Sequence, residues 1–367
     1  MTIASAFAMM LSTSALAQST VCVSVDSSGV PGNGYSSRSR LSADGEHVAF
    51  LSMSTNLVPM TSPPYYLQVY THDVSTGATE CASIGLGGAP ANDVCCELFY
   101  IIDTGPAISA DGHFVAFESL ADNLVPGTSG ESPRLYLRDM IAGSTQLITS
   151  NGYCPALSDD GRFLAYVNSE ALVLDRQTGI TQDLGSASLL YGPNYSPSIS
   201  ITPDGRFVTF PSGSSSLVHG DTNGVDDVFV KDRAFDTMQR INTNSLGYQA
   251  NDTSAGGTIS KDGRFVFFTS FATNLGGHGQ RGQCFRKDRH SGAVLQVSLF
   301  PVSDGQPDSI SADGNRVALD SPAGAYVRDL PVGSTTSFGL GTTQPSLSRD
   351  GRSVSFTLGG QVYLRRL

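Results

Sequence analysis

Hydrophobic and polar positions follow one phrase that occurs seven times along this chain. An aliphatic residue is followed by Ser or Thr, one further residue, an Asp-Gly pair, and then apolar residues at every second position. Self-similarity at a period of a few dozen residues indicates a repeat architecture. Because Gly accepts the positive φ of a tight turn, each pair predicts a hairpin between two strands. The seven pairs begin at Asp44, Asp111, Asp160, Asp204, Asp262, Asp313 and Asp350.

Two further strands complete each repeat. A third apolar segment ends in Asp at residues 70–73, 136–139, 172–175, 229–232, 285–288 and 326–329. The seventh copy, residues 363–366, carries Arg366 at this position. A turn containing Gly, such as the one at Gly77, then leads to a fourth strand, and no segment has a helical period. The sequence therefore predicts an all-β fold, a seven-bladed β-propeller with four antiparallel strands in each blade. The recurring Asp residues are predicted to hold their own turns rather than to act in catalysis.

The two ends of the chain predict how the ring closes. The seventh repeat stops at Leu367, directly after its third strand. Residues 20–25 resemble a fourth strand, such as residues 294–298, and precede the first repeat. We expect this N-terminal strand to complete the last blade, which would remove the open sheet edge. A linear solenoid would need capping repeats at its ends, and the sequence contains none.

The repeat resembles a known family. Residues 259–268, Ile-Ser-Lys-Asp-Gly-Arg-Phe-Val-Phe-Phe, and residues 228–233, Val-Phe-Val-Lys-Asp-Arg, look like the WD-type repeat of TolB-like propellers. The resemblance extends over nearly the whole chain from about residue 20. It implies a propeller fold and, for function, a platform that binds a protein, a peptide or another envelope ligand.

Composition and charge exclude several partners. The chain has 22 basic and 33 acidic residues, so its net charge of -11 would repel a phosphate backbone, and we expect no nucleic-acid binding. No basic stripe suits an anionic membrane surface. The 40 Gly and 18 Pro could indicate either disorder or many tight turns. The hydrophobic content of 40% argues against disorder, so tight turns are the better explanation. After the first residues, no apolar segment approaches the roughly 18 residues that a membrane span requires.

The N-terminal segment predicts export. Residues 1–17 contain no charge, include an apolar stretch and end in Ala15-Leu16-Ala17, which fits a signal-peptide cleavage site. We therefore expect a signal peptide at residues 1–17, a single propeller domain at residues 18–367, and a periplasmic or extracellular location. A disordered apolar tail is the alternative.

Six cysteines agree with an oxidising compartment. A disulfide from Cys81 to Cys95 or Cys96 would staple the longest insertion between repeats. Alternatively, the cysteines are small buried strand residues, an interpretation that we prefer for Cys22 and Cys284. Cys154 is a further possible partner, so the disulfide pairing among Cys81, Cys95, Cys96 and Cys154 stays open. A zinc site is not expected, because no paired Cys-x-x-Cys or nearby His completes one.

One loop resembles part of a calcium site. Asp221, Asn223, Asp226 and Asp227 place oxygen ligands around Gly224, which would permit the sharp turn of such a loop. The bidentate Glu that ends an EF-hand loop is missing. The same residues also form polar turns without any ion, so the calcium site is a hypothesis.

Tyrosines recur in the predicted connections between blades. Amphipathic rings with one hydroxyl each are good recognition groups for peptides or sugars. They would serve equally as wedges between neighbouring blades. The predicted ligand-binding tyrosines are Tyr35, Tyr100, Tyr153, Tyr191, Tyr195 and Tyr248.

A metal-dependent enzyme acting on a polysaccharide or peptide is the alternative from another class. His219 and His278 fall in nearly equivalent loops and would flank a metal with Asp221 at the pore mouth, as in propeller-fold polysaccharide lyases. No Gly-x-Ser-x-Gly elbow offers a serine nucleophile.

We expect a non-enzymatic, exported, monomeric propeller that needs no cofactor, except calcium if the acidic loop binds it. Its partner would be a protein, a peptide or an envelope component bound over the tyrosine-lined face. A structural module from a larger surface protein is a third interpretation. The functional part of this expectation rests on analogy between folds.

Overall fold

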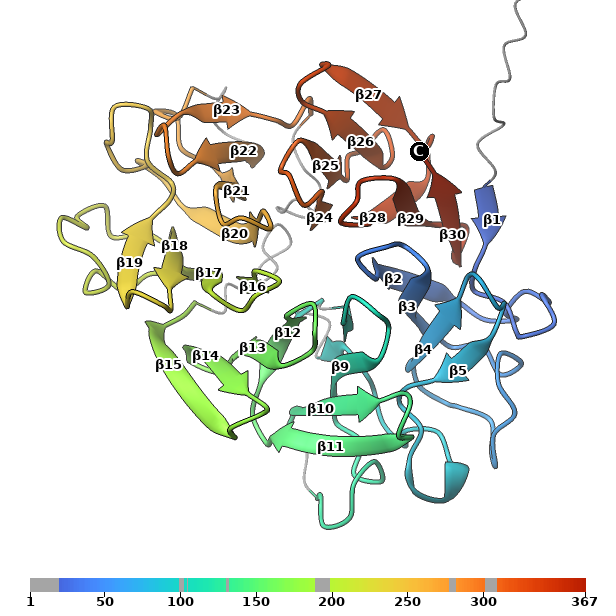
Figure 1. Cartoon of the computed structure of the whole chain (residues 1–367). Helices are drawn as coiled ribbons and strands as arrows, with labels where there is room; N and C mark the ends of the chain where they lie inside the picture. The colour runs from blue at the N-terminus through green and yellow to red at the C-terminus, as the bar shows by residue number, and fades with distance from the viewer. Residues whose placement is uncertain are drawn as a thin grey trace, which may run out of the picture.

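The computed structural model is a ring of seven antiparallel sheets, each of four strands (Figure 1). It describes residues 20–98, 102–103, 105–129, 132–188, 199–276, 282–300 and 309–367. The predicted all-β, seven-bladed propeller is confirmed. Within these ranges, the 3-10 helix η1 (Leu86–Gly88) is the single helical element. The same ranges contain no helix with the length and apolar character needed to cross a bilayer.

The blades follow one another along the chain. Blade 1 contains β2 (Ser36–Leu41), β3 (His47–Ser52), β4 (Gln68–Asp73) and β5 (Thr79–Cys81). Blade 2 contains β8 (Ala107–Ile108), β9 (Phe114–Ser119), β10 (Arg134–Asp139) and β11 (Ser144–Thr149). Blade 3 contains β12 (Tyr153–Leu157), β13 (Phe163–Val167), β14 (Glu170–Asp175) and β15 (Ile180–Ser186). Blade 4 contains β16 (Ser200–Ile201), β17 (Phe207–Ser212), β18 (Asp227–Asp232) and β19 (Thr237–Arg240).

The remaining blades have the same strand order. Blade 5 contains β20 (Ser254–Ile259), β21 (Phe265–Ser270), β22 (Gln283–Asp288) and β23 (Val294–Gln296). Blade 6 contains β24 (Ser309–Ile310), β25 (Arg316–Leu319), β26 (Tyr326–Asp329) and β27 (Ser334–Ser337). Blade 7 contains β28 (Thr342–Leu347), β29 (Ser353–Leu358), β30 (Gln361–Arg366) and β1 (Thr20–Cys22). A small pair, β6 (Glu97–Leu98) and β7 (Ile102–Asp103), lies in the connection between blades 1 and 2.

The direction of the strands defines two faces of the ring. The first strand of every blade contacts the first strand of the next, from β2 and β8 around to β28 and β2, so these strands surround the axis. First and third strands begin at the same end of each blade, which we call the upper face. The lower face carries the Asp-Gly turns and the turns between third and fourth strands. Connections between blades leave from the upper face.

The seven Asp-Gly turns share one hydrogen-bond pattern. The Asp44 carboxylate accepts hydrogen bonds from the Ser42 hydroxyl at 2.7 Å and from the Glu46 backbone N–H at 3.0 Å. The same two bonds recur at every later pair, from Asp111 to Asp350. These carboxylates hold their own turns, as predicted, because a side chain that bonds nearby amides fixes the local backbone.

The Gly of each pair also forms a contact between neighbouring blades. Gly205 in blade 4 has φ 72°, and a Cβ atom there would lie 2.1 Å from Cδ2 of Phe163 in blade 3. Gly161 approaches Phe114 of blade 2 in the same way. A side chain at this position would strain the backbone and displace the neighbouring ring. The Asp-Gly motif therefore specifies packing between blades as well as the turn.

The hydrophobic core lies between adjacent blades. One cluster combines Phe50 and Tyr70 of blade 1 with Val362 and Leu364 of blade 7. Second and third strands contribute stacked rings, and the centroids of Phe50 and Tyr70 are 5.9 Å apart. Each sheet thus buries apolar side chains against its neighbours, which is the main favourable contribution to folding.

The N-terminal strand completes the last blade, as predicted. β1 pairs antiparallel with β30, with Thr20 opposite Arg365, and Figure 1 shows the two strands side by side. The Val23 N–H donates to the Val362 carbonyl at 2.9 Å. Segments that lie far apart in the sequence therefore share one sheet at the point where the ring closes.

The departure of the seventh repeat strengthens this closure. The Arg366 guanidinium pairs with Glu46 of blade 1 at 2.6 Å and donates to the Ser353 hydroxyl at 3.2 Å. In blades 3 to 6, the Asp of the third strand instead pairs with an Arg of its own blade, as in Arg162–Asp175 at 2.7 Å. The exchange of Asp for Arg thus converts a bond within a blade into a bond between blades.

The six cysteines are free thiols in this structure. The disulfide considered between Cys81 and Cys95 or Cys96 is not formed, and all three side chains are buried. Burial raises the pKa of the Cys81 thiol to about 11 and that of Cys95 to about 12, which keeps both thiols neutral. Cys284 is buried as expected, whereas Cys22 is half-buried in β1.

Candidate functional site

Three of the six predicted tyrosines lie in the described ranges. Tyr35 is 52% exposed on the upper face, directly before β2. Tyr153 begins β12 and is half-buried. Tyr248 is 67% exposed. The predicted positions outside the described residues are Tyr100, Tyr191, Tyr195 and His278.

Tyr248 does not share a face with Tyr35. It belongs to a small hairpin, closed by a bridge between Thr243 and Gln249, in the connection between blades 4 and 5. At the tip of this hairpin, the Ser245 hydroxyl accepts a hydrogen bond from the Val294 N–H at 3.4 Å, where β23 begins. Fourth strands begin at the lower end, so the hairpin bends along the flank of the ring and carries Tyr248 away from the upper face.

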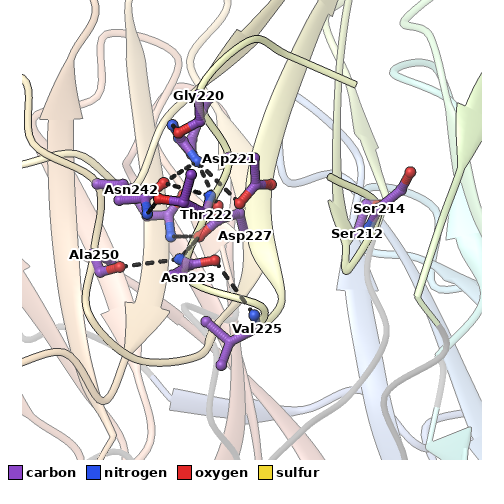
Figure 2. Close-up of polar contacts among 12 residues, drawn as sticks. Ser212, Ser214, Gly220, Asp221, Thr222, Asn223, Val225, Asp227, Asn242 and Ala250 are labelled. Carbon is purple, nitrogen blue, oxygen red and sulfur yellow. Dashed lines mark hydrogen bonds and ion pairs between the residues drawn. The ribbon is translucent and has the colours of Figure 1, made fainter. Parts of the chain in front are cut away.

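The acidic loop between β17 and β18 encloses a guanidinium group. Arg240, at the end of β19, lies 3.3 Å from Asp221 Oδ1 and 3.1 Å from Asp227 Oδ2. Asp227 is fully buried and accepts hydrogen bonds from the side-chain amides of Asn223 and Asn242, and Figure 2 shows these groups converging. Burial and the charge of Asp227 raise the pKa of Asp221, while Arg240 opposes that shift. A cationic side chain thus already bridges two of the carboxylates predicted to bind calcium.

The other predicted metal ligands are engaged elsewhere or exposed. The Asp226 carboxylate accepts a hydrogen bond from the Ser188 hydroxyl. His219 is exposed, directly before Gly220. Across the part of the chain that the structure describes, no group of three or more His, Cys, Asp or Glu side chains is arranged to hold a metal ion.

Equivalent positions in other blades indicate a scaffold role for Asp227. It begins the third strand of blade 4, where Gln68 and Arg134 begin the third strands of blades 1 and 2. The Gln68 amide donates to the Ala91 carbonyl at 3.1 Å, and Arg134 donates to the Leu120 carbonyl at 3.1 Å. A buried polar side chain at this position therefore anchors the surrounding connections, whatever its charge.

An open pocket lies on the upper face between blades 6 and 7. Its volume is about 480 Å³, and its walls come from the loop after β25 and from the start of β28 with the turn before it. None of these pocket residues was predicted from the sequence to form a site. The lining residues are Asp320, Ser321, Pro322, Gly324, Leu340, Gly341, Thr343 and Gln344.

A β-bulge in the first strand of blade 7 shapes the pocket wall. The register shifts between Thr343 and Ser346, and Gln344 adopts φ 54°. Its backbone N–H donates to Asp320 Oδ2 at 2.8 Å, and the Ser321 N–H donates to Asp320 Oδ1 at 3.1 Å. The Gln344 side-chain oxygen accepts a hydrogen bond from the Arg38 N–H of blade 1 at 3.1 Å. The wall is therefore held by bonds across three blades.

A signal for this site exists in the repeat. When the seven repeats are aligned on their Asp-Gly pairs, each position of the repeat forms one column. Asp320 occupies the column that holds Leu51 in blade 1, Val167 in blade 3 and Thr357 in blade 7. Glu118 in blade 2 is the other acid in this column, and its carboxylate accepts the Cys154 N–H of blade 3 at 2.5 Å. An acid in this column thus fixes the bulged first strand of the following blade.

Exposed apolar side chains continue from the pocket across the closure of the ring. Leu340, Leu358, Tyr35 and Met53, which we call the closure patch, are 82%, 39%, 52% and 47% exposed. A Cβ atom at Gly341 would lie 3.8 Å from Leu358 Cδ1, so Leu358 adjoins the pocket rim. The Met53 N–H donates to the Tyr35 carbonyl at 2.9 Å. Contiguous exposed apolar side chains of this kind mark interaction sites in soluble proteins.

Comparison with known proteins identifies the architecture. No protein-family model and no curated protein matches this sequence. An oligogalacturonate lyase solved in complex with manganese is 13% identical, with a TM-score of 0.59 over 95% of this chain and 98% of the lyase chain. The β-propeller domain of the Trilobed protease from Pyrococcus furiosus is 11% identical, with a TM-score of 0.55 over 90% of this chain and 95% of that domain.

TolB from Acinetobacter baumannii is also among the similar structures, at 17% identity and a TM-score of 0.46 over 93% of this chain and 81% of TolB. Identities this low indicate a shared fold alone, because one fold hosts many activities. The Pyrococcus furiosus domain is described as having an open velcro topology. In the present chain, by contrast, β1 pairs with β30 and closes the ring.

The pocket lining combines one acid with polar and apolar groups. Of its eight lining residues, Asp320 is the only one with an ionisable side chain. A fixed acceptor beside an exposed Leu can orient a bound group that has an apolar and a polar end.

Proposed function

We propose that this protein is an exported, non-enzymatic binding platform that captures a polypeptide segment on its upper face. The observation that carries the proposal is the continuity between the pocket and the closure patch. Leu340 is 82% exposed and lines the pocket, and Leu358 adjoins it. Interfaces of this kind use a few apolar or aromatic anchors beside pockets with placed polar groups.

The rigidity of the site supports the same proposal. The pocket walls belong to strands and short turns, and backbone amides fix the Asp320 carboxylate. Little side-chain or loop ordering would then be needed on binding, which reduces the entropic cost of association. Export is supported by the signal-like residues 1–17 of the sequence.

Peptide selection tests this function. A phage library of short random peptides is selected on immobilised wild-type protein and, in parallel, on the Leu340→Asp variant. We expect the wild-type protein to enrich peptides whose affinity falls about tenfold or more on Leu340→Asp, because an apolar anchor is removed.

A matched control separates the patch from general surface hydrophobicity. Leu246 is 83% exposed on the flank hairpin, so Leu246→Asp makes the same chemical change at almost the same exposure. This variant should bind the selected peptides as the wild-type protein does. Equal losses in both variants, or the absence of any enriched peptide, would contradict the proposal.

A further inference from the structure

Charge is divided unevenly between the two faces of the ring. At the lower face, basic side chains are paired with the third-strand aspartates of their own blades. Arg206 contacts Asp232 at 2.7 Å, and Arg264 contacts Asp288 at 2.8 Å. The Asp residues of the turns are themselves engaged by local amides. Positive and negative side chains at the lower face therefore largely compensate each other.

The upper face is dominated by carboxylates. They lie in the loops after second strands, in the connections between blades, and at the starts of third strands. Asp122 and Asp252 are exposed, Glu170 is half-buried at the start of β14, and Asp320 is 4% exposed at the pocket. The described carboxylates at this end include Asp93, Asp122, Glu170, Asp221, Asp226, Asp227, Asp252 and Asp320.

The described basic side chains at or near this end include Arg38, next to the pocket wall, as well as Arg134 and Arg240. Arg134, at the start of β10, is 3% exposed and donates to backbone carbonyls. Arg240, at the end of β19, bridges Asp221 and Asp227. Arg240 thus offsets part of the charge of Asp221 and Asp227, whereas Asp122 and Asp252 remain exposed acids. Among the described residues, the upper face therefore carries more carboxylates than basic groups, and the pocket and the closure patch lie on this face.

We infer that the segment bound at the closure patch is basic, a stretch in which Lys or Arg alternates with apolar residues. This inference rests on the proposed function and names the class of its partner. Apolar residues of the segment lie on Leu340 and Leu358, while the acids of the upper face attract its cationic groups through their long-range field. A field of one sign accelerates encounter with an oppositely charged partner and rejects acidic ones.

Three synthetic peptides of one length test the inference, with Leu alternating with Lys, Ser or Glu. Binding to the wild-type protein is followed by fluorescence anisotropy at low and at raised salt. We expect the Lys peptide to bind about tenfold more tightly than the Ser peptide at low salt, the difference to shrink as salt screens the charges, and the Glu peptide to bind least.

Charge reversal locates the effect. The double variant Asp122→Lys, Asp252→Lys should weaken binding of the Lys peptide. The control Glu80→Lys, Asp236→Lys makes the same change of net charge at an outer strand and at a lower turn, and should leave binding nearer to the wild-type value. Equal weakening in both double variants would assign the effect to overall charge and overturn the inference.

The outcomes distinguish this inference from the function on which it rests. If the Lys and Ser peptides bind equally at every salt concentration and both are weakened by Leu340→Asp, the platform stands and the basic partner is wrong. If no peptide binds, or if Leu340→Asp leaves the peptide affinity unchanged, the proposed function and the inference are both wrong.

Discussion

Asp159 in blade 3 and Arg349 in blade 7 form an ion pair across the ring, although 190 positions separate them in the sequence. Each is the residue between Ser and Asp in the first turn of its blade. Backbone bonds gather these turns around the axis, and the Ala312 N–H donates to the Arg349 carbonyl at 2.7 Å. The pair therefore spans the lower mouth of the ring, opposite the face that carries the pocket.

Removing this pair should weaken the ring slightly. The Asp159 and Arg349 side chains are 31% and 32% exposed, so solvent screens their attraction. We expect a coupling of about 0.5–1 kcal/mol between Asp159→Asn and Arg349→Gln in a double-mutant cycle of urea unfolding. Peptide binding at the upper face should be unchanged in both variants. A coupling near zero would show that the pair does not hold the lower mouth together.

The Gly of the Asp-Gly pair should tolerate no side chain where the neighbouring blade packs on it. Gly205→Ala places a methyl group at φ 72° and against the Phe163 ring. We expect a loss of about 2–4 kcal/mol in the free energy of unfolding, from backbone strain and overpacking together. Urea unfolding measures the change.

Gly179 supplies the control for packing. Its φ is 73°, almost the same as that of Gly205, and a Cβ atom there would meet nothing within 4 Å. Gly179→Ala should therefore lose only the backbone contribution, about 1–2 kcal/mol. Equal losses at Gly179 and Gly205 would mean that the ring contact contributes nothing.

The framework of this fold could be predicted because its signals are local. Asp-Gly turns and apolar alternation lie within about ten residues of each other, and they locate the strands of every blade. The closure by β1 was predictable because the last repeat lacked one strand. The packing of Gly205 on Phe163 was not, since it joins residues of different repeats. Only an alignment of the seven repeats could indicate that the Gly of one blade packs on a side chain of the preceding blade.

The candidate site was predictable only in part. Tyr35 lies on the upper face as expected, but Tyr248 is carried to the flank because its connection folds into a hairpin. The pocket depends on Asp320 and Gln344, which depart from the repeat in two neighbouring blades and meet only through the ring. Asp320 is visible in the sequence as an acid at a repeat position where other blades have Leu51 and Val167. Its partner Gln344 could not be recognised in this way.

Acid should destabilise the protein through the third-strand aspartates. A hydrogen bond from Arg264 holds the pKa of Asp288 well below its usual range, and Arg162 does the same for Asp175. Hydrogen bonds from Ser75 and Thr76 outweigh burial and lower the pKa of Asp73 to about 2. These shifts stabilise the fold above the unfolded-state pKa of about 3.9, and the contribution is lost as pH falls toward about 2.

Stability measured by thermal unfolding should thus be nearly constant from about pH 7 to pH 5 and fall below about pH 4. Arg264→Gln should reduce the steepness of that fall, because the pKa of Asp288 returns toward its ordinary value. An unchanged acid profile in this variant would be inconsistent with the assigned cause.

Arg240 should make the acidic loop independent of calcium. Its guanidinium already lies between Asp221 and Asp227, so chelators should leave the melting temperature of the wild-type protein unchanged. Arg240→Met leaves two buried carboxylates facing each other, and we expect a loss of about 3 kcal/mol or more. Millimolar calcium should recover part of that loss, since oxygen ligands remain. A rise in the wild-type melting temperature with calcium would instead support the ion site predicted from the loop.

The closure of the ring depends on one short strand, so its buried side chain should matter more than its length suggests. Val23, directly after β1, is 1% exposed against Val362 and Leu364 of blade 7, whereas Val21 within β1 is 43% exposed. Val23→Ala should lower the free energy of unfolding by about 2 kcal/mol, and Val21→Ala by no more than about 0.5 kcal/mol. Faster amide exchange along β30 in the Val23 variant alone would show that the loss arises from opening at this joint. Because Tyr35 and Leu358 flank the same joint, peptide affinity at the closure patch should decline with it. A variant that is destabilised without faster exchange in β30 would place the weakness elsewhere in the ring.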